Sequence, residues 1–358
     1  MAPRLAFRYR DDDPWPVVKQ AFNIIVPYLQ ADCDTSASLV AERLAALTPA
    51  RRELAVGERK ETSASFLLEF WEVFIGIARQ VPYDDSSSQE RVARLLQELE
   101  TLDTPSAEVS TKLYCSCARR VASATPTSQL TLARLDYCAY VEGTATFGPR
   151  LTRAMARQVV AFNGQDASPS PNLYLTEPSA LESDSRVLAE WINLNSFVAR
   201  IWSVDLLNAT DFAVWTLRYC FETPCTGPAA FQECRLVAAA QYIEHCSPQL
   251  YKLMKHGQPS ASEQGVLRSP LFRAEQVLCL ERWSHWKFGF GAFAEGAFSD
   301  ISKAQATDAV RIMERVQEEA STTRQGESTS MPREASHSRG WLDVLWSMFS
   351  PLRPLVAR

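Results

Sequence analysis

Residues 186–222 read RVLAEWINLNSFVARIWSVDLLNATDFAVWTLRYCFE, the segment richest in aromatic and apolar side chains in the chain. The spacing of its apolar residues predicts two consecutive helices, 187–207 and 211–222, joined by a turn at 208–210. Asn195 falls in the middle of the apolar arc of the first helix, where an unpaired side-chain amide costs about 1–3 kcal/mol. We therefore expect Asn195 to have a hydrogen-bond partner.

The second of these helices is apolar around almost its whole circumference. Asp211 is a suitable N-cap, and only Arg218 and Glu222, adjacent at i and i+4, interrupt the apolar surface. A helix that is apolar on all sides is normally enclosed by other helices. We therefore place residues 211–222 at the centre of a bundle, with 187–207 beside it.

The rest of the chain supplies the neighbours of this pair. Helical patterns run through residues 15–30, 36–47, 65–81, 87–102, 233–246, 274–288 and 300–318. Pro82 ends one of them, and Ser87 with Glu90 forms a capping box for the next. The helix around Trp283 is a third wall of the bundle, with the stem of Lys287 packed on that tryptophan or its ammonium over the ring. The predicted fold is all-α, an irregular multi-helix bundle around a central buried helix.

The composition divides the chain into five parts. Residues 1–20 are expected to be a flexible N-terminus, and residues 21–320 a single helical domain. Within that domain, residues 106–185 are ambiguous and end in a long polar loop. Residues 321–340 hold almost no large apolar side chain and are expected to be a disordered linker. Residues 341–358 form a short amphipathic tail.

The net charge and the cysteine content indicate which partners and which cellular compartment to expect. The 358 residues carry a formal net charge of −5, which argues against nucleic acid as a partner of the whole molecule. A basic region within residues 111–163 is better explained as a solvated helix face than as a nucleic-acid site. The nine cysteines, with no secretory signal before them, indicate reduced thiols in the cytoplasm or nucleus. No stretch is long and apolar enough for a transmembrane segment.

No motif in the chain predicts a known chemistry. Gly289-x-Gly291-x-x-Ala294 fits a loose dinucleotide fingerprint, but no β-strand pattern precedes it, so we interpret the glycines as a helix terminator and turn. His245 projects to the polar side of its helix and is interpreted as a surface residue. We therefore predict no catalytic residues, no metal site and no cofactor.

Two features of the sequence suggest binding. A small-molecule pocket is one hypothesis, and its predicted lining is Trp191, Asn195, Trp215, Arg218, Glu222 and Trp283. The other feature is the tail from Trp341 to Leu352, flanked by arginines. It is expected to dock on protein, its own or a partner, more readily than on a membrane.

Several blocks, taken in order, resemble an uncharacterised family of fungal proteins catalogued only as a domain of unknown function. The blocks are the run from Phe70 through Val81-Pro82 to Leu99, WINLNSFVAR at 191–200, Trp215-x-Leu217-Arg218 with Glu222, Ala238-Ala239-Ala240-x-x-Ile243 followed by Leu250-Tyr251, and Glu281-Arg282-Trp283-x-x-Trp286-Lys287. The resemblance implies an all-helical fungal protein with no assigned activity and no known catalytic residues.

Three classes of function follow from these observations. A non-catalytic helical protein-interaction or scaffold protein of the fungal cytosol or nucleus is the leading hypothesis. The alternatives are a small-molecule-binding protein or unrecognised enzyme that uses the tryptophan-lined pocket, and peripheral membrane association through the C-terminal tail.

Overall fold

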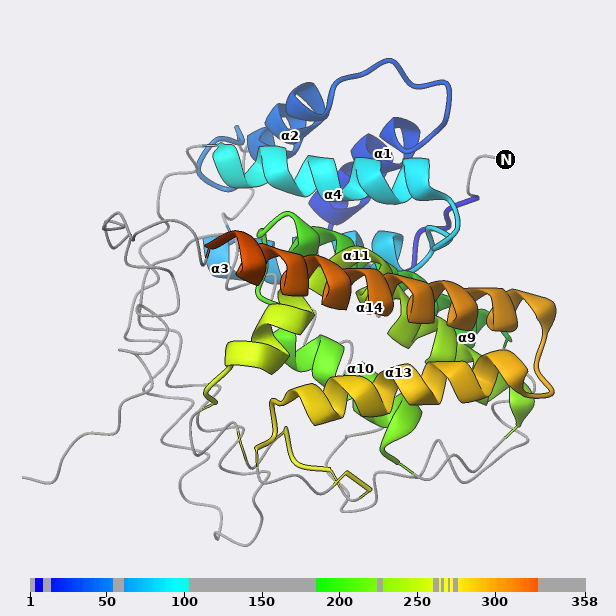
Figure 1. The fold of residues 1–358 in the computed structure, drawn as a ribbon. Helices are drawn as coiled ribbons and strands as arrows, with labels where there is room; N and C mark the ends of the chain where they lie inside the picture. Colours follow the sequence, from blue (N-terminus) through cyan, green and yellow to red (C-terminus); the bar gives the residue numbers. More distant parts are fainter. Residues whose placement is uncertain are drawn as a thin grey trace, which may run out of the picture. The chain divides into compact units, whose positions relative to one another are not determined.

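The computed structural model describes residues 4–8, 14–53, 61–102, 185–223, 228–259, 264, 267–269, 271–272 and 276–327. These ranges contain nine helices and no strand, which confirms the predicted all-α fold (Figure 1). The chain divides into two compact units, one of residues 1–108 with 145–319 and one of residues 109–144 with 320–358. Of the second unit, the structure describes only residues 320–327.

Four helices come from the N-terminal third of the chain: α1 (Pro16–Tyr28), α2 (Ala37–Ala46), α3 (Ser63–Ala78) and α4 (Ser86–Thr101). α1 packs against α2 and α3, and α2 packs against α4. The cap of α4 differs from the prediction. Asp85, not Ser87, is the N-cap, and its carboxylate accepts a hydrogen bond from the amide of Ser88 at 3.1 Å. The helix therefore begins two residues earlier than the capping box indicated.

Five helices follow: α9 (Ser185–Ser203), α10 (Thr210–Phe221), α11 (Ala229–His256), α13 (Leu280–Glu295) and α14 (Asp300–Glu327). α9 lies along α11, and it also contacts α3 and α4. α10 and α13 both pack against α11 and against each other. The two halves of the unit thus meet at α9.

The most enclosed helix is α9, whereas the sequence pointed to α10. Every residue from Asn193 to Trp202 is buried, polar ones included. α10 buries the side that faces its neighbours, but Trp215, Arg218, Tyr219 and Phe221 are only half-buried. The apolar circumference of α10 misled the prediction because the polar residues of α9 are also buried, and Asn193, Asn195 and Arg200 have hydrogen-bond partners elsewhere in the bundle.

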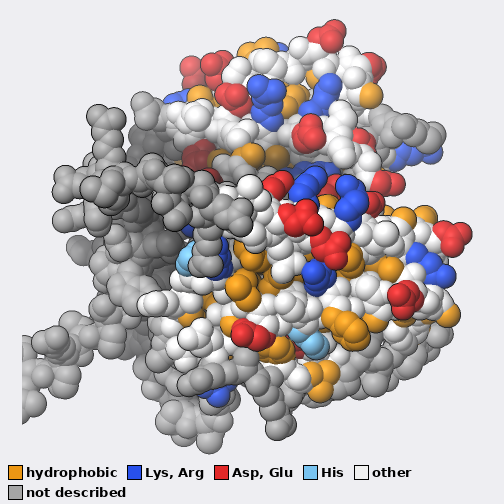
Figure 2. Space-filling view, in the orientation of Figure 1, with side chains coloured by type: hydrophobic (Ala, Val, Ile, Leu, Met, Phe, Trp, Pro, Cys, Tyr) orange, Lys and Arg blue, Asp and Glu red, His pale blue; other side chains and the backbone are white. Residues whose placement is uncertain are grey.

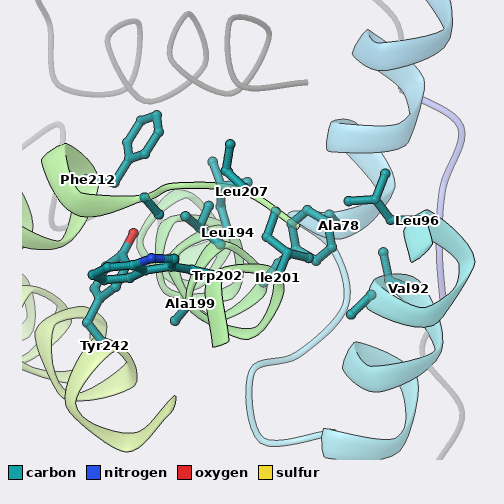
Figure 3. Packing of buried hydrophobic residues seen from close by; sticks show 14 of the residues in the cluster. Ala78, Val92, Leu96, Leu194, Ala199, Ile201, Trp202, Leu207, Phe212 and Tyr242 are labelled. Carbon is teal, nitrogen blue, oxygen red and sulfur yellow. The ribbon is translucent and has the colours of Figure 1, made fainter. Parts of the chain in front are cut away.

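One apolar cluster joins the two halves. Figure 3 shows side chains of α9 between Ala78, Val92 and Leu96 on one side and Tyr242 on the other. A smaller separate cluster lies at the start of α9, formed by Leu188, Trp191, Phe231, Cys234 and Ala238. Burial of a large apolar side chain stabilises a fold by about 1.5–3 kcal/mol. The larger cluster, which joins the two halves, is therefore the main source of stability.

α11 continues beyond residue 246, the predicted end of its helical pattern. The helix runs to His256, but Cys246 has non-helical dihedral angles, φ −129° and ψ 15°, and marks a kink. A proline in a helix removes one backbone hydrogen bond and clashes with the preceding turn. The chain accommodates Pro248 by bending two residues before it instead of ending the helix.

Helices extend into both end segments of the predicted division of the chain. Within the expected flexible N-terminus, α1 begins at Pro16, and Ala6 exchanges two hydrogen bonds with the side chain of Gln80, at 2.9 and 3.0 Å. Within the expected linker, α14 continues to Glu327. The segment 106–184, the linker from residue 328 and the tail at 341–358 lie outside the described residues.

Candidate functional site

The polar side of α9 holds the turn between α3 and α4. The side-chain oxygen of Asn193 accepts from the amide of Tyr83 at 2.8 Å, and its nitrogen donates to the carbonyl of Arg79 at 2.9 Å. Gln89 of α4 donates to the carbonyl of Val81 at 2.9 Å from within the same buried region. Asn193 therefore acts as a structural clamp, replacing the backbone partners that this turn lacks.

Asn195 has the partners that its position in the apolar arc required. Its side-chain oxygen accepts from Thr216 of α10 at 3.2 Å and from Tyr242 of α11 at 3.1 Å, and its nitrogen donates to the carbonyl of Trp191 at 2.9 Å. These bonds confirm the expected partner. They connect α9, α10 and α11 at a buried point, so the amide is occupied within the protein.

Arg200 brings α9, α4 and α11 together at the edge of the bundle. The side chain is buried, and one terminal nitrogen lies 2.6 Å from Nε2 of His245. The other lies 3.4 Å from the carbonyl of Tyr83 and 3.4 Å from the hydroxyl of Ser86. Burial lowers the pKa of Arg200, while Glu244 and Glu90 oppose this effect.

His245 is not the surface residue that the sequence indicated. Its side chain is 16% exposed and faces the guanidinium of Arg200. Burial and the neighbouring cation together lower the pKa of His245 to about 3. The imidazole is therefore neutral at physiological pH and accepts a hydrogen bond from Arg200.

A second buried arginine joins α10 to α13. Arg282 makes a bidentate ion pair with Glu222, with nitrogen–oxygen distances of 2.7 and 2.8 Å. Trp286 donates to the same carboxylate at 2.6 Å, and Arg282 also donates to the carbonyls of Val277 and Leu267. Glu222 and Arg282 are almost completely buried, so the pair is shielded from solvent and from salt.

The partner of Glu222 lies on another helix, although Arg218 is its neighbour at i and i+4 on α10. Arg218 instead donates to the carbonyl of Arg268 at 2.8 Å, and burial lowers its pKa. The carboxylate of Glu222 pairs with Arg282, which lies 60 positions further along the chain. At the same helix end, His285 lies with Nε2 at 3.2 Å from the carbonyl of Phe221.

The tryptophans of the predicted pocket lie in different surroundings. Trp191 belongs to the small cluster at the start of α9, and Trp215 is half-buried on α10. Trp283 is fully buried and packs edge-on against Tyr251 with 5.2 Å between ring centroids. Because Asn195 and Glu222 are hydrogen-bonded within the protein, the six-residue pocket stays a prediction that this geometry does not strengthen.

The prediction that the glycines of α13 end this helix was wrong. Gly289 and Gly291 lie inside the helix and do not terminate it. A Cβ on Gly289 would lie 2.4 Å from the ring of Phe221, so this glycine permits the close approach of α10 to α13. The packing of the Lys287 stem on Trp283 stays a prediction. Its ammonium donates to Gln317 of α14 at 2.9 Å.

Sequence reasoning missed Arg282, Arg200 and His245. A signal was present for Arg282, which lies four residues before Trp286 and so on the apolar side of its helix. A charged residue at such a position needs a buried partner. For Arg200 and His245 no comparable signal existed, because both fall on sides of their helices that looked polar.

Metal and thiol chemistry find little support in the described part of the chain. No group of three or more His, Cys, Asp or Glu side chains is gathered there as a metal site would require. Five cysteines in those ranges are free, and burial raises the pKa of the Cys234 and Cys246 thiols. A thiol with a raised pKa is a weak nucleophile at neutral pH.

None of the described helices has the length and apolar content needed to cross a membrane.

Comparison with known proteins gives one match. Neither the curated proteins nor the solved structures include a match to this chain. The model of one protein family matches residues 71–290, more than half of the chain, from the middle of α3 to α13. The matched range contains Asn193, Arg200, Glu222 and Arg282, the residues of the polar contacts described above. The chain therefore belongs to the family described as "Protein of unknown function (DUF3632)".

Proposed function

We propose that the protein is a non-catalytic helical interaction protein that binds an amphipathic helix of a partner on the outer face of α13. The observation that carries the proposal is Phe288, whose side chain is 76% exposed, more than any other large apolar side chain in the described residues. Exposed aromatic side chains in the middle of a surface are typical anchors of protein interfaces.

The surroundings of Phe288 suit a helix as the bound element. Ser284 and Ala292, four residues before and after it, are exposed, and a Cβ on Gly291 would meet no atom within 4 Å. Residues three and four apart share one helix face. Small side chains on both sides of Phe288 let the backbone of a partner helix approach closely while the ring inserts between its side chains.

Charge gives the partner helix a defined character. Glu281 and Glu295 are exposed at the two ends of this face, separated by about 21 Å at 1.5 Å per residue. Figure 2 shows mixed basic and acidic side chains along α14 and apolar patches below them, towards α13. The surface therefore favours a helix with an apolar stripe and a basic residue near each end.

The same proposal assigns a second binding segment and a location. The tail from Trp341 to Leu352 is an amphipathic segment of the kind that binds protein partners. The free cysteines of the described residues support the cytoplasm or nucleus as the site of action.

A photo-crosslinking experiment tests the interface in the cell. The full-length chain carries p-benzoylphenylalanine at position 288, and a matched chain carries it at the exposed position of Ile301. We expect position 288 to crosslink to another protein at least five-fold more than position 301. The crosslinked peptide is expected to be an amphipathic helix with basic ends. Equal crosslinking at the two positions, or a crosslinked segment without this pattern, would refute the proposal.

A binding measurement tests the charge of the partner. Two 18-residue helical peptides share one apolar stripe, and they carry arginine or glutamate near both ends. Fluorescence anisotropy is expected to give at least ten-fold tighter binding for the arginine peptide, and Phe288→Ala is expected to remove that binding. Equal affinity for both peptides, or binding unchanged in Phe288→Ala, would show that α13 is not the docking face.

A further inference from the structure

The N-terminus of α4 lies against a buried cation whose charge is incompletely paired. Arg200 is 8% exposed, its Nε has no hydrogen-bond partner among the described residues, and no carboxylate oxygen of theirs lies within 4.0 Å of its guanidinium. Its closest side-chain partner is the neutral ring of His245. Buried cations are normally matched by an anion, so this position is suited to receive one.

The residue placed to supply the anion is Ser86. Its side chain is exposed, and its hydroxyl oxygen lies 3.4 Å from a terminal nitrogen of Arg200. Ser86 is the first residue of a 16-residue helix, where backbone amides have no intrahelical acceptor and the helix dipole favours negative charge. Two independent features, a helix N-terminus and a buried cation, therefore meet at one hydroxyl group.

We propose that Ser86 is a phosphorylation site and that its phosphate pairs with Arg200. A protein kinase would transfer the γ-phosphoryl group of ATP to the Ser86 oxygen. The new O–P bond forms as the bond between the β- and γ-phosphates breaks, ADP leaves, and the hydroxyl proton passes to the kinase base. The phosphate brings up to two negative charges and three acceptor oxygens to the guanidinium and to the first amides of α4.

Four acidic side chains near Ser86 and Arg200 could repel a phosphate on Ser86. Asp85 is engaged as the N-cap of α4, and Asp84 and Glu90 are exposed to solvent. Glu244 is 46% exposed, and its carboxylate lies 4.0 Å from Nε2 of His245, the ring nitrogen that faces Arg200. Exposed carboxylates are screened by water and salt, whereas Arg200 is desolvated, so the near cation dominates the energy of a phosphate on Ser86.

The titration of the phosphate tests the pairing directly. Full-length chains with genetically encoded phosphoserine at position 86, or at the exposed neighbour Ser87 as the matched control, are compared by 31P NMR. The second phosphate pKa is expected to be about one unit lower at position 86, and the melting temperature about 3 °C higher, than in the Ser87 control. Equal titration and equal melting at the two positions would overturn the proposal.

Two further measurements identify the source of the effect. Arg200→Lys keeps the charge but loses the planar donor pair, and it is expected to reduce by half or more the difference between phosphoserine 86 and its control. An unchanged difference would contradict the role of Arg200. The unmodified chain is also titrated with inorganic phosphate. A free-phosphate stabilisation equal to that of phosphoserine 86 would show an anion-binding site rather than a modification site.

Discussion

Two interfaces of the molecule bury an arginine, and they satisfy it in opposite ways. Between α10 and α13, Arg282 donates to the carboxylate of Glu222 and to two backbone carbonyls, all inside the protein. The same carboxylate also accepts a hydrogen bond from Trp286. Between α9, α4 and α11, Arg200 has a neutral imidazole, one carbonyl and one exposed hydroxyl. The first site is electrically complete and holds the fold. At the second site no carboxylate pairs with Arg200. The stability of this site therefore depends on pH, and an anion could match the charge of the guanidinium.

The largest effect is expected when the complete pair is broken. Glu222→Gln leaves Arg282 buried without a counter-charge, which typically costs about 3–5 kcal/mol of stability. Urea denaturation of the full-length chain measures the loss, and Glu281→Gln, at the exposed neighbour of Arg282, is the control with an expected change under about 0.5 kcal/mol.

The double variant Glu222→Leu with Arg282→Met sharpens the result. If the cost of Glu222→Gln comes from an uncompensated charge, replacing both partners by apolar side chains is expected to recover at least half of it. A Glu222→Gln chain as stable as the original would show that the pair does not hold α10 to α13.

The next effect concerns how closely α10 and α13 approach at this interface. Gly289→Ala places a methyl group 2.4 Å from the ring of Phe221, and such overpacking typically costs about 1–3 kcal/mol. Gly291→Ala, two residues along the same helix, meets open space and is expected to gain up to about 1 kcal/mol from helix propensity. Thermal denaturation of both variants gives the sign, and two changes of the same sign would contradict the assigned contact.

The site around Arg200 and His245 is expected to lower the stability of the protein in acid. The folded-state pKa of His245 is about 3, below the ordinary histidine value of 6.5. As the pH falls below 6.5, the unfolded chain binds a proton that the folded chain does not bind until near pH 3. The free energy of unfolding therefore decreases from pH 6.5 towards pH 3, and this contribution is constant above pH 6.5.

Comparison with His245→Gln isolates that contribution. Between pH 7 and pH 5 the original chain is expected to lose about 1–2 kcal/mol more stability than the variant, measured by urea denaturation at both values. His256→Gln, at the exposed end of α11, is the control and is expected to keep the pH dependence of the original chain. An identical dependence in His245→Gln would show that the ring is not held neutral by Arg200 and burial.

The sequence predicted local structure better than long-range pairing. The helices were predictable because apolar spacing reports one helix face, and the partner of Asn195 was predictable because a buried amide must be satisfied. The pairing of Glu222 with Arg282 was not, because 60 residues separate them and helical spacing favoured Arg218. The enclosed position of α9 was missed because its polar residues looked like a solvated face.

The smallest effect compares the buried pair with a surface pair of similar chemistry. Lys287 of α13 donates to Gln317 and lies 3.7 Å from Glu314 of α14, with 28% and 55% of the two charged side chains exposed. Exposed pairs contribute at most about 1 kcal/mol, because water screens them and ordering two long side chains costs entropy. Lys287→Met is therefore expected to cost less than about 1 kcal/mol in urea denaturation, with Arg311→Met, whose partner Asp308 lies on its own helix, as the control. If Lys287→Met were as destabilising as Glu222→Gln, burial would not be the property that separates the two ion pairs, because the same type of contact would have the same energy inside and outside the bundle.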